Sequence, residues 1–162
     1  MITSDAFWRI VICGLIATFV MSMIAFLQGG IGLPVIDVGY LITSSFNEVH
    51  VNEPYDILWG NIAYYIIGVL LALIWVIFLQ NRIPGNWFLQ GLIYGTMVSV
   101  VAGLVVSPLV SLSAGDWFGI FYLDTWTPGL VILAGLLMHL AYGITLLLGL
   151  KYAGIKGIDA AQ

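Results

Sequence analysis

Charged residues are scarce in this chain. Its 162 residues include 4 basic and 8 acidic side chains, and 62% of the residues are apolar. Soluble globular domains carry charge on about a quarter of their residues, so the composition excludes that class. The net charge of −4 also excludes a nucleic-acid-binding role, because such binding depends on clustered cations.

Cysteine and histidine are almost absent as well. Cys13 is the single cysteine, so no disulfide can form within the chain, and its apolar surroundings predict a small core residue. Of the two histidines, only His139 falls in an apolar stretch, which excludes a bis-histidine haem site within the predicted helices. No nucleophile–base pair is visible in the sequence, so we predict that the chain is not an enzyme by itself.

What the sequence does contain is four long apolar stretches, at about 10–32, 57–79, 87–109 and 128–150. Each can cross roughly 30 Å of hydrocarbon as an α-helix. They predict an all-α membrane protein with four transmembrane helices in one domain over residues 1–162. The first stretch is longer than a signal-peptide core and lacks a small-x-small cleavage site before Gln28, so we expect a retained helix.

The basic residues predict the orientation of these helices. With four crossings, all of them fall on one side of the membrane: Arg9, Arg82, Lys151 and Lys156. The positive-inside rule places that side, with both termini, in the cytoplasm. Six carboxylates fall in the two long loops on the opposite side: Asp37, Glu48, Glu53, Asp56, Asp116 and Asp124. We therefore expect cytoplasmic termini and external loops.

The two halves of the chain carry matching segments. Gly14-Leu15-Ile16 corresponds to Gly91-Leu92-Ile93, and Asn61-Ile62-Ala63-Tyr64 corresponds to His139-Leu140-Ala141-Tyr142. These matches predict two tandem helical hairpins, over about 8–80 and 85–155. Because each hairpin crosses twice, the copies would form a parallel repeat about an axis along the membrane normal.

Small residues at four-residue spacing predict where the helices touch. They are Gly14, Thr18 and Ser22 in the first stretch, Gly91, Gly95, Ser99 and Gly103 in the third, and Gly135 and Gly143 in the fourth. Such stripes let helix backbones approach closely in lipid. We expect the first and third helices to form the central contact.

His139 is the candidate cofactor-binding residue, because an ionisable group deep in a membrane usually has a function. A haem ligand, a hydrogen bond to a quinone and a proton relay all suit imidazole. The structural alternative is a neutral histidine bonded to Thr18, Ser22, Ser99 or a backbone carbonyl. Its repeat mate Asn61 is also polar, which favours the structural interpretation. We therefore predict no cofactor, with lipid or quinone contact left open.

The external loops contain two further candidate sites. Asp37 is placed to cap a short interfacial helix through Phe46, and after this helix Glu48, His50, Glu53 and Asp56 gather possible metal ligands. A hydrated acidic loop that contacts a partner explains the same residues without a metal. The second loop carries five aromatic residues, Trp117, Phe118, Phe121, Tyr122 and Trp126, which predict a contact with a partner subunit. A membrane-interface belt and a quinone-headgroup surface are the alternatives.

Several segments resemble a family of small bacterial four-helix membrane proteins of uncharacterised function. The resemblance rests on Gly14–Met21, Gly32–Asp37, Gly103–Leu109 and His139–Gly143, and so covers most of the chain. It implies a bacterial inner-membrane protein. In that family the second helix often begins with tryptophan and a histidine, whereas here Trp59 is followed by Asn61.

Two functional hypotheses follow. The first is an accessory subunit of a larger membrane complex, such as a respiratory or other electron-transfer assembly, with integral membrane subunits and lipids as its partners. The second is a small transporter or channel in which His139 and Asn61 line the path. Transporters usually contain broken helices and several intramembrane polar groups, so the first hypothesis is preferred.

Overall fold

The structure is a computed structural model, and the residues that it describes are 2–46, 54–113, 119–122 and 127–155. This part of the chain is helical, with no strand. Four of its helical spans are long and apolar enough to cross a membrane: Ser4–Ile31, Leu58–Leu79, Trp87–Val110 and Pro128–Tyr152. The prediction of an all-α fold with four helices able to cross a membrane is therefore confirmed for the described residues.

Ten helical elements make up these spans and the segments between them. In chain order they are α1 (Ser4–Leu27), the 3-10 turn η1 (Gln28–Ile31), α2 (Val38–Phe46), α3 (Pro54–Ile74), the π-helical turn η2 (Trp75–Leu79), α4 (Trp87–Val101), the π-helical turn η3 (Ala102–Val106), α5 (Ser107–Ser113), the 3-10 turn η4 (Ile120–Tyr122) and α6 (Pro128–Tyr152). Side-chain caps begin two of the long helices. Thr3 accepts from the backbone N–H of Ala6 at 3.3 Å, and Asn86 accepts from that of Leu89 at 2.9 Å.

The third membrane helix continues beyond the end expected at residue 109. It passes from α4 through η3 into α5 and reaches Ser113. Pro108 has no backbone N–H, and its ring would collide with the preceding turn of a regular α-helix. The π-helical turn at Ala102–Val106 directly precedes this proline, and widening the helix there lets it continue without a break.

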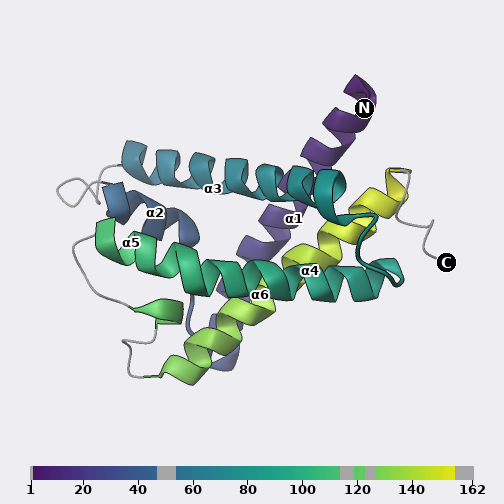
Figure 1. Ribbon diagram of the computed structural model, residues 1–162. Helices are drawn as coiled ribbons and strands as arrows, with labels where there is room; N and C mark the ends of the chain where they lie inside the picture. The colour runs from purple at the N-terminus through teal and green to yellow at the C-terminus, as the bar shows by residue number, and fades with distance from the viewer. Residues whose placement is uncertain (1, 47–53, 114–118, 123–126, 156–162) are drawn as a thin grey trace.

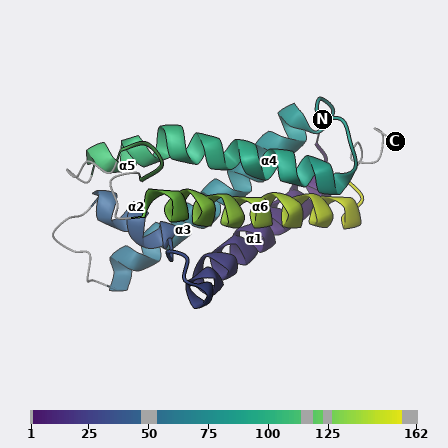
Figure 2. The ribbon, with the colours of Figure 1, turned by 90° about the horizontal axis from the view of Figure 1, so that it is seen from below.

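The long helices pack in the order α4, α6, α1, α3. Figure 2 shows α6 between α4 and α1, and α3 packs against α1. The expected central contact between the first and third helices is therefore wrong, since α6 separates α1 from α4. The small-residue faces of α1 and α4 do make close contacts, but with different partners: α1 with α3, and α4 with α6.

This order leaves a seam between α3 and α4. Side chains bridge the seam at one end, where the rings of Trp75 and Tyr94 lie 4.8 Å apart and Tyr94 donates to the carbonyl of Leu71 at 2.6 Å. Along the rest of the seam the two backbones hardly approach each other (Figure 1). If the two hairpins were equivalent, the contact between α1 and α6 would have its counterpart between α4 and α3. The helices α4 and α3 do not pack together in this way. The tandem repeat itself stays a prediction.

We call the end of the bundle where α1 begins and α6 ends the termini end, and the opposite end the loop end (Figure 1). Arg9 joins the two helices at the termini end, donating to the carbonyl of Ala153 at 2.9 Å and pairing with Asp5 at 2.8 Å. Arg82 lies in the α3–α4 connection at the same end, and Lys151 in the last turn of α6. Lys156 lies outside the described residues.

The core is densest in the half of the bundle nearest the termini end. Fully buried side chains from α1, η2 and α6 meet there: Ile10, Trp75, Leu146, Leu147 and Leu150. Cys13 is buried among them, which confirms that it is a small core residue. Most other apolar side chains face outward, as expected of helices surrounded by lipid.

Candidate functional site: a cavity within the bundle

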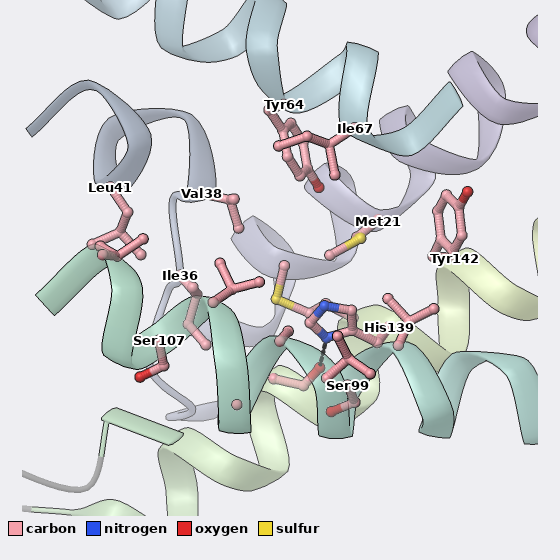
Figure 3. A pocket seen from close by; sticks show the side chains of 18 of the residues that line it. Met21, Ile36, Val38, Leu41, Tyr64, Ile67, Ser99, Ser107, His139 and Tyr142 are labelled. Carbon is pink, nitrogen blue, oxygen red and sulfur yellow. Dashed lines mark hydrogen bonds between the residues drawn. The ribbon is translucent and has the colours of Figure 1, made fainter. Parts of the chain in front are cut away.

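The half of the bundle nearest the loop end contains a cavity of about 240 Å³ (Figure 3). All the long helices contribute to its wall, with Met21 from α1, Tyr64 from α3, Val98 from α4 and His139 from α6. Among the described residues, the lining is largely apolar and includes no Asp, Glu, Lys or Arg. The site is therefore suited to an uncharged, lipophilic molecule.

Small residues leave this space unfilled. A Cβ added at Gly135 would meet nothing closer than Ile36 Cδ1 at 4.0 Å, so that wall of α6 faces open volume. Two further small residues, Ser99 of α4 and Ala102 of η3, also line the cavity and leave its volume open. The stripe that looks like a packing surface in the sequence thus borders a cavity over its later part.

The short helix α2 covers the loop end of the cavity. The Asp37 carboxylate accepts from the backbone N–H of Tyr40 at 3.0 Å and so fixes its first turn. Close approach to α3 follows from two glycines: an added Cβ at Gly39 would meet the Asn61 side chain at 2.6 Å, and one at Gly60 would overlap Thr43 and the Gly39 carbonyl. As a result, α2 packs into the bundle, and its side chains help to line the cavity.

Phe121 forms another part of the wall. Its ring packs against Gly103, where a Cβ would overlap the ring atoms. Phe121 has a φ of 54°, a left-handed conformation that a bulky residue seldom adopts. Nearby, the Ser107 hydroxyl donates to the Gly119 carbonyl at 2.7 Å and ties this segment to α5. Phe121, expected as an external contact residue, therefore points inward.

The seam between α3 and α4 forms the open side of the cavity. Ile67 of α3 and Val101 of α4 both line the cavity, yet they are 46% and 55% exposed on the outer surface. Both residues lie within candidate membrane spans, so in a bilayer this opening would face hydrocarbon. A molecule dissolved in the membrane could enter from the side without crossing a charged surface.

Three polar side chains border the cavity near its inner end. The Tyr142 hydroxyl donates to the Gly68 carbonyl at 2.6 Å and joins α6 to α3. His139 Nδ1 lies 2.6 Å from the carbonyl of Gly135 on its own helix, which matches the expectation of a histidine bonded to a backbone carbonyl. The buried Tyr64 hydroxyl has no hydrogen bond; Ser22 is near enough to interact with it but not at hydrogen-bond geometry.

A second cavity, also of about 240 Å³, lies beside the first and has a more polar lining. Its wall includes Ser22, Asp37 and Asn61, together with Tyr64. Tyr64 lines both cavities and so lies on their boundary. The repeat mates Asn61 and His139 thus border different spaces.

The remaining residues predicted to pack between helices lie at tight crossings. Gly91 and Gly95 of α4 meet the backbone of α6, where a Cβ on Gly95 would lie 2.5 Å from the His139 carbonyl oxygen. Gly143 meets Gly91 and Gly95 from the other side. On α1, Gly14 lies against the backbone of Val69, and Thr18 fills the space above Gly68.

The predicted loop sites fall mostly outside the described residues. Glu48, His50, Glu53, Trp117, Phe118 and Trp126 all lie there. Of Asp56 and Tyr122 only the backbone is described, in the first turn of α3 and in η4. Within the described part of the chain, no group of three metal-ligating side chains comes together.

Sequence reasoning did not identify Tyr64 and Tyr142 as site residues. A sequence signal was present, because each tyrosine lies three positions after a polar residue in the repeated segments Asn61–Tyr64 and His139–Tyr142. Only the polar residues that begin these segments, Asn61 and His139, are predicted from the sequence to be site residues. Comparison with protein-family models, curated protein sequences and solved structures gives no match, so the function has to be argued from this geometry.

Proposed function

We propose that this protein is a non-catalytic membrane subunit that holds a lipophilic molecule between its helices. The observation that carries this proposal is the uncharged cavity of about 240 Å³ with its open side between α3 and α4. Unfilled volume in a protein interior is costly, at about 24 cal/mol per Å³ in soluble proteins. A lipid-like molecule entering from the bilayer would fill that volume and gain dispersion contacts.

The direct test is to identify what the purified protein carries. We expect native mass spectrometry from mild detergent to find a lipophilic molecule bound at about one per chain. Gly135→Leu should remove it, because the new side chain would project into the cavity. Gly129→Leu is the matched control on the same helix, since Gly129 has nothing within 4 Å and does not line the cavity.

The control makes the result interpretable. If the two variants retain the molecule equally, it binds elsewhere on the apolar surface and the cavity is not its site. If the wild-type protein carries no lipophile and takes none up from lipid vesicles, the proposed function is wrong.

We further propose that the protein holds this molecule as an accessory subunit of a larger membrane complex, such as an electron-transfer assembly. Support comes from the absence of a metal-ligand cluster in the described residues and from the long loops, whose aromatic and acidic residues suit protein contacts. Native gel electrophoresis of gently solubilised membranes should show the protein in a band much larger than 17.7 kDa plus detergent. Migration as a lone small species would contradict this assignment.

The second candidate is a small transporter. The observation in its favour is the pair of adjacent cavities that share Tyr64, one apolar and one bordered by Asp37 and Asn61. Flux of a lipophilic substrate into proteoliposomes that falls in both His139→Ala and Asn61→Ala would favour transport. Binding without flux would favour the accessory subunit.

A further inference from the structure

The His139 ring has a defined tautomer in this structure. A backbone carbonyl can only accept a hydrogen bond, so the 2.6 Å contact with Gly135 requires that Nδ1 carry the hydrogen. A second proton on Nε2 would place a charged ring in a membrane span, beside a cavity whose described lining residues include no counter-ion. Nε2 is therefore an unprotonated acceptor.

The free nitrogen of His139 faces the cavity. Among the described residues, the bond to Gly135 is the one hydrogen bond that the ring makes. Nε2 is not one of the fully buried side-chain atoms that lack a hydrogen-bond partner. Figure 3 shows Nε2 on the opposite side of the ring from the bonded Nδ1, directed toward the middle of the cavity near Met21. No hydrogen bond to a described residue occupies this acceptor, so a molecule in the cavity can supply its partner.

Tyr64 also lines the cavity, but its hydroxyl does not face the open volume. The side chain is 6% exposed, and the hydroxyl oxygen is fully buried, close to Ser22 of α1. Of these two side chains, His139 therefore presents the polar atom that a molecule in the cavity can reach.

We propose that the cavity recognises a neutral lipophile through a hydroxyl group. The hydroxyl of the lipophile donates to His139 Nε2. This inference rests on the proposed function and specifies the ligand's head. Long-chain alcohols and the reduced, hydroquinone form of a quinone share this donor. Carboxylates, phosphates and oxidised quinones lack this donor. Their oxygen atoms would face His139 Nε2, so that two hydrogen-bond acceptors would meet.

The shape of the site agrees with one small head and a trailing chain. The polar groups lie at the inner end of the cavity, and the opening between Ile67 and Val101 leads outward. A chain leaving through this opening would remain among apolar side chains and lipid. The cavity needs to enclose only the head and the first part of the tail.

Matched probes test the donor directly. Binding to purified protein in nanodiscs is measured for hexadecanol and its methyl ether, and for a decyl-substituted hydroquinone, its dimethyl ether and the corresponding quinone. We expect each hydroxyl form to bind about tenfold more tightly than its ether, the usual upper range for one neutral hydrogen bond. The quinone should behave like the ethers. The two series show whether the site prefers an aliphatic or an aromatic hydroxyl.

Two variants assign the preference to His139. His139→Leu should bring hydroxyl and ether probes to nearly equal affinity while the ethers still bind, because the cavity persists. Tyr64→Phe is the control and should leave the preference unchanged, because the Tyr64 hydroxyl is fully buried and an ether oxygen could accept from it as well as a hydroxyl oxygen.

The outcomes separate this inference from the proposed function. If hydroxyl and ether probes bind wild-type protein equally well, the cavity takes lipophiles but the proposed recognition is wrong. A preference that survives in His139→Leu also overturns it. If no probe binds and no lipophile co-purifies, the proposed function fails as well.

Discussion

The two halves of the bundle are built from similar residues, yet one is solid and the other is hollow. Toward the termini end, glycines lie directly against the backbone of a neighbouring helix, and large side chains such as Trp75 fill what remains. Toward the loop end, Gly135 faces open volume on the same helix that carries Gly143. A small residue therefore marks a contact in one half and a space in the other. The difference depends on what lies opposite.

The helix order explains why the hollow forms at the loop end. The helices α1 and α6 close one side of the bundle, while α3 and α4 are joined by Trp75 and Tyr94 at one end of their seam. Beyond Tyr94 the described residues form no comparable side-chain contact between α3 and α4. The helix α2 and Phe121 cover the loop end of the cavity. The hollow half thus has walls but an open side.

The largest expected effect comes from adding bulk to the two halves of α6. Gly143→Val should prevent stable folding, because a Cβ there would overlap the Gly91 carbonyl and meet the Gly95 backbone. Backbone cannot move aside as a side chain does, so we expect a loss of about 3 kcal/mol or more. Gly135→Val should have little effect on stability. Thermal unfolding in detergent, followed by size exclusion, measures both.

A similar loss in both variants would contradict this comparison. It would mean that any branched residue in α6 is destabilising and that the volume beside Gly135 is not available. Equal tolerance would instead imply that α4 and α6 can separate without cost.

A smaller effect is expected when bulk is removed. Leu147→Ala should destabilise the solid half by about 2–5 kcal/mol, since the side chain is fully buried and leaves a void. Ile67→Ala, at the edge of the cavity and 46% exposed, should cost about 1 kcal/mol or less. Unfolding in mixed detergent micelles gives both free energies. A larger cost for Ile67 would show that the seam is closed in solution.

The sequence predicts the parts of this fold that depend on a single helix. Hydropathy and length predict all four spans, and the place of Cys13 in an apolar stretch predicts its burial. Which helices touch depends on the facing side chains of both partners, so the small-residue stripes could not show that α6 separates α1 from α4. The π-helical turn η3 before Pro108 could not be predicted, because hydropathy and length do not distinguish a π-helical turn from a regular α-helical one.

For the same reason, the sequence identifies His139 as a candidate site residue but not Tyr64. His139 stands out in the sequence because an ionisable residue is rare in an apolar stretch. Tyr64 does not stand out, since tyrosine is common in membrane helices and its repeat mate Tyr142 has an ordinary interhelical bond. Tyr64 becomes notable when the burial of its hydroxyl and its position beside the cavity are known.

The smallest expected effect separates these two tyrosines. Tyr142→Phe removes a hydrogen bond between α6 and the Gly68 carbonyl, and such interhelical bonds contribute about 0.6 kcal/mol on average in a membrane protein. Tyr64→Phe removes a buried hydroxyl with no partner, so in protein stripped of lipophiles it should be neutral or slightly stabilising. The two substitutions delete the same atom from repeat mates, so propensity and volume effects largely cancel. Adding a hydroxyl-bearing lipophile should leave this order unchanged, because the Tyr64 hydroxyl is fully buried and does not face the cavity. Unfolding measured with and without hexadecanol tests this, and a Tyr64→Phe effect that depends on the added alcohol would mean that the hydroxyl reaches the ligand.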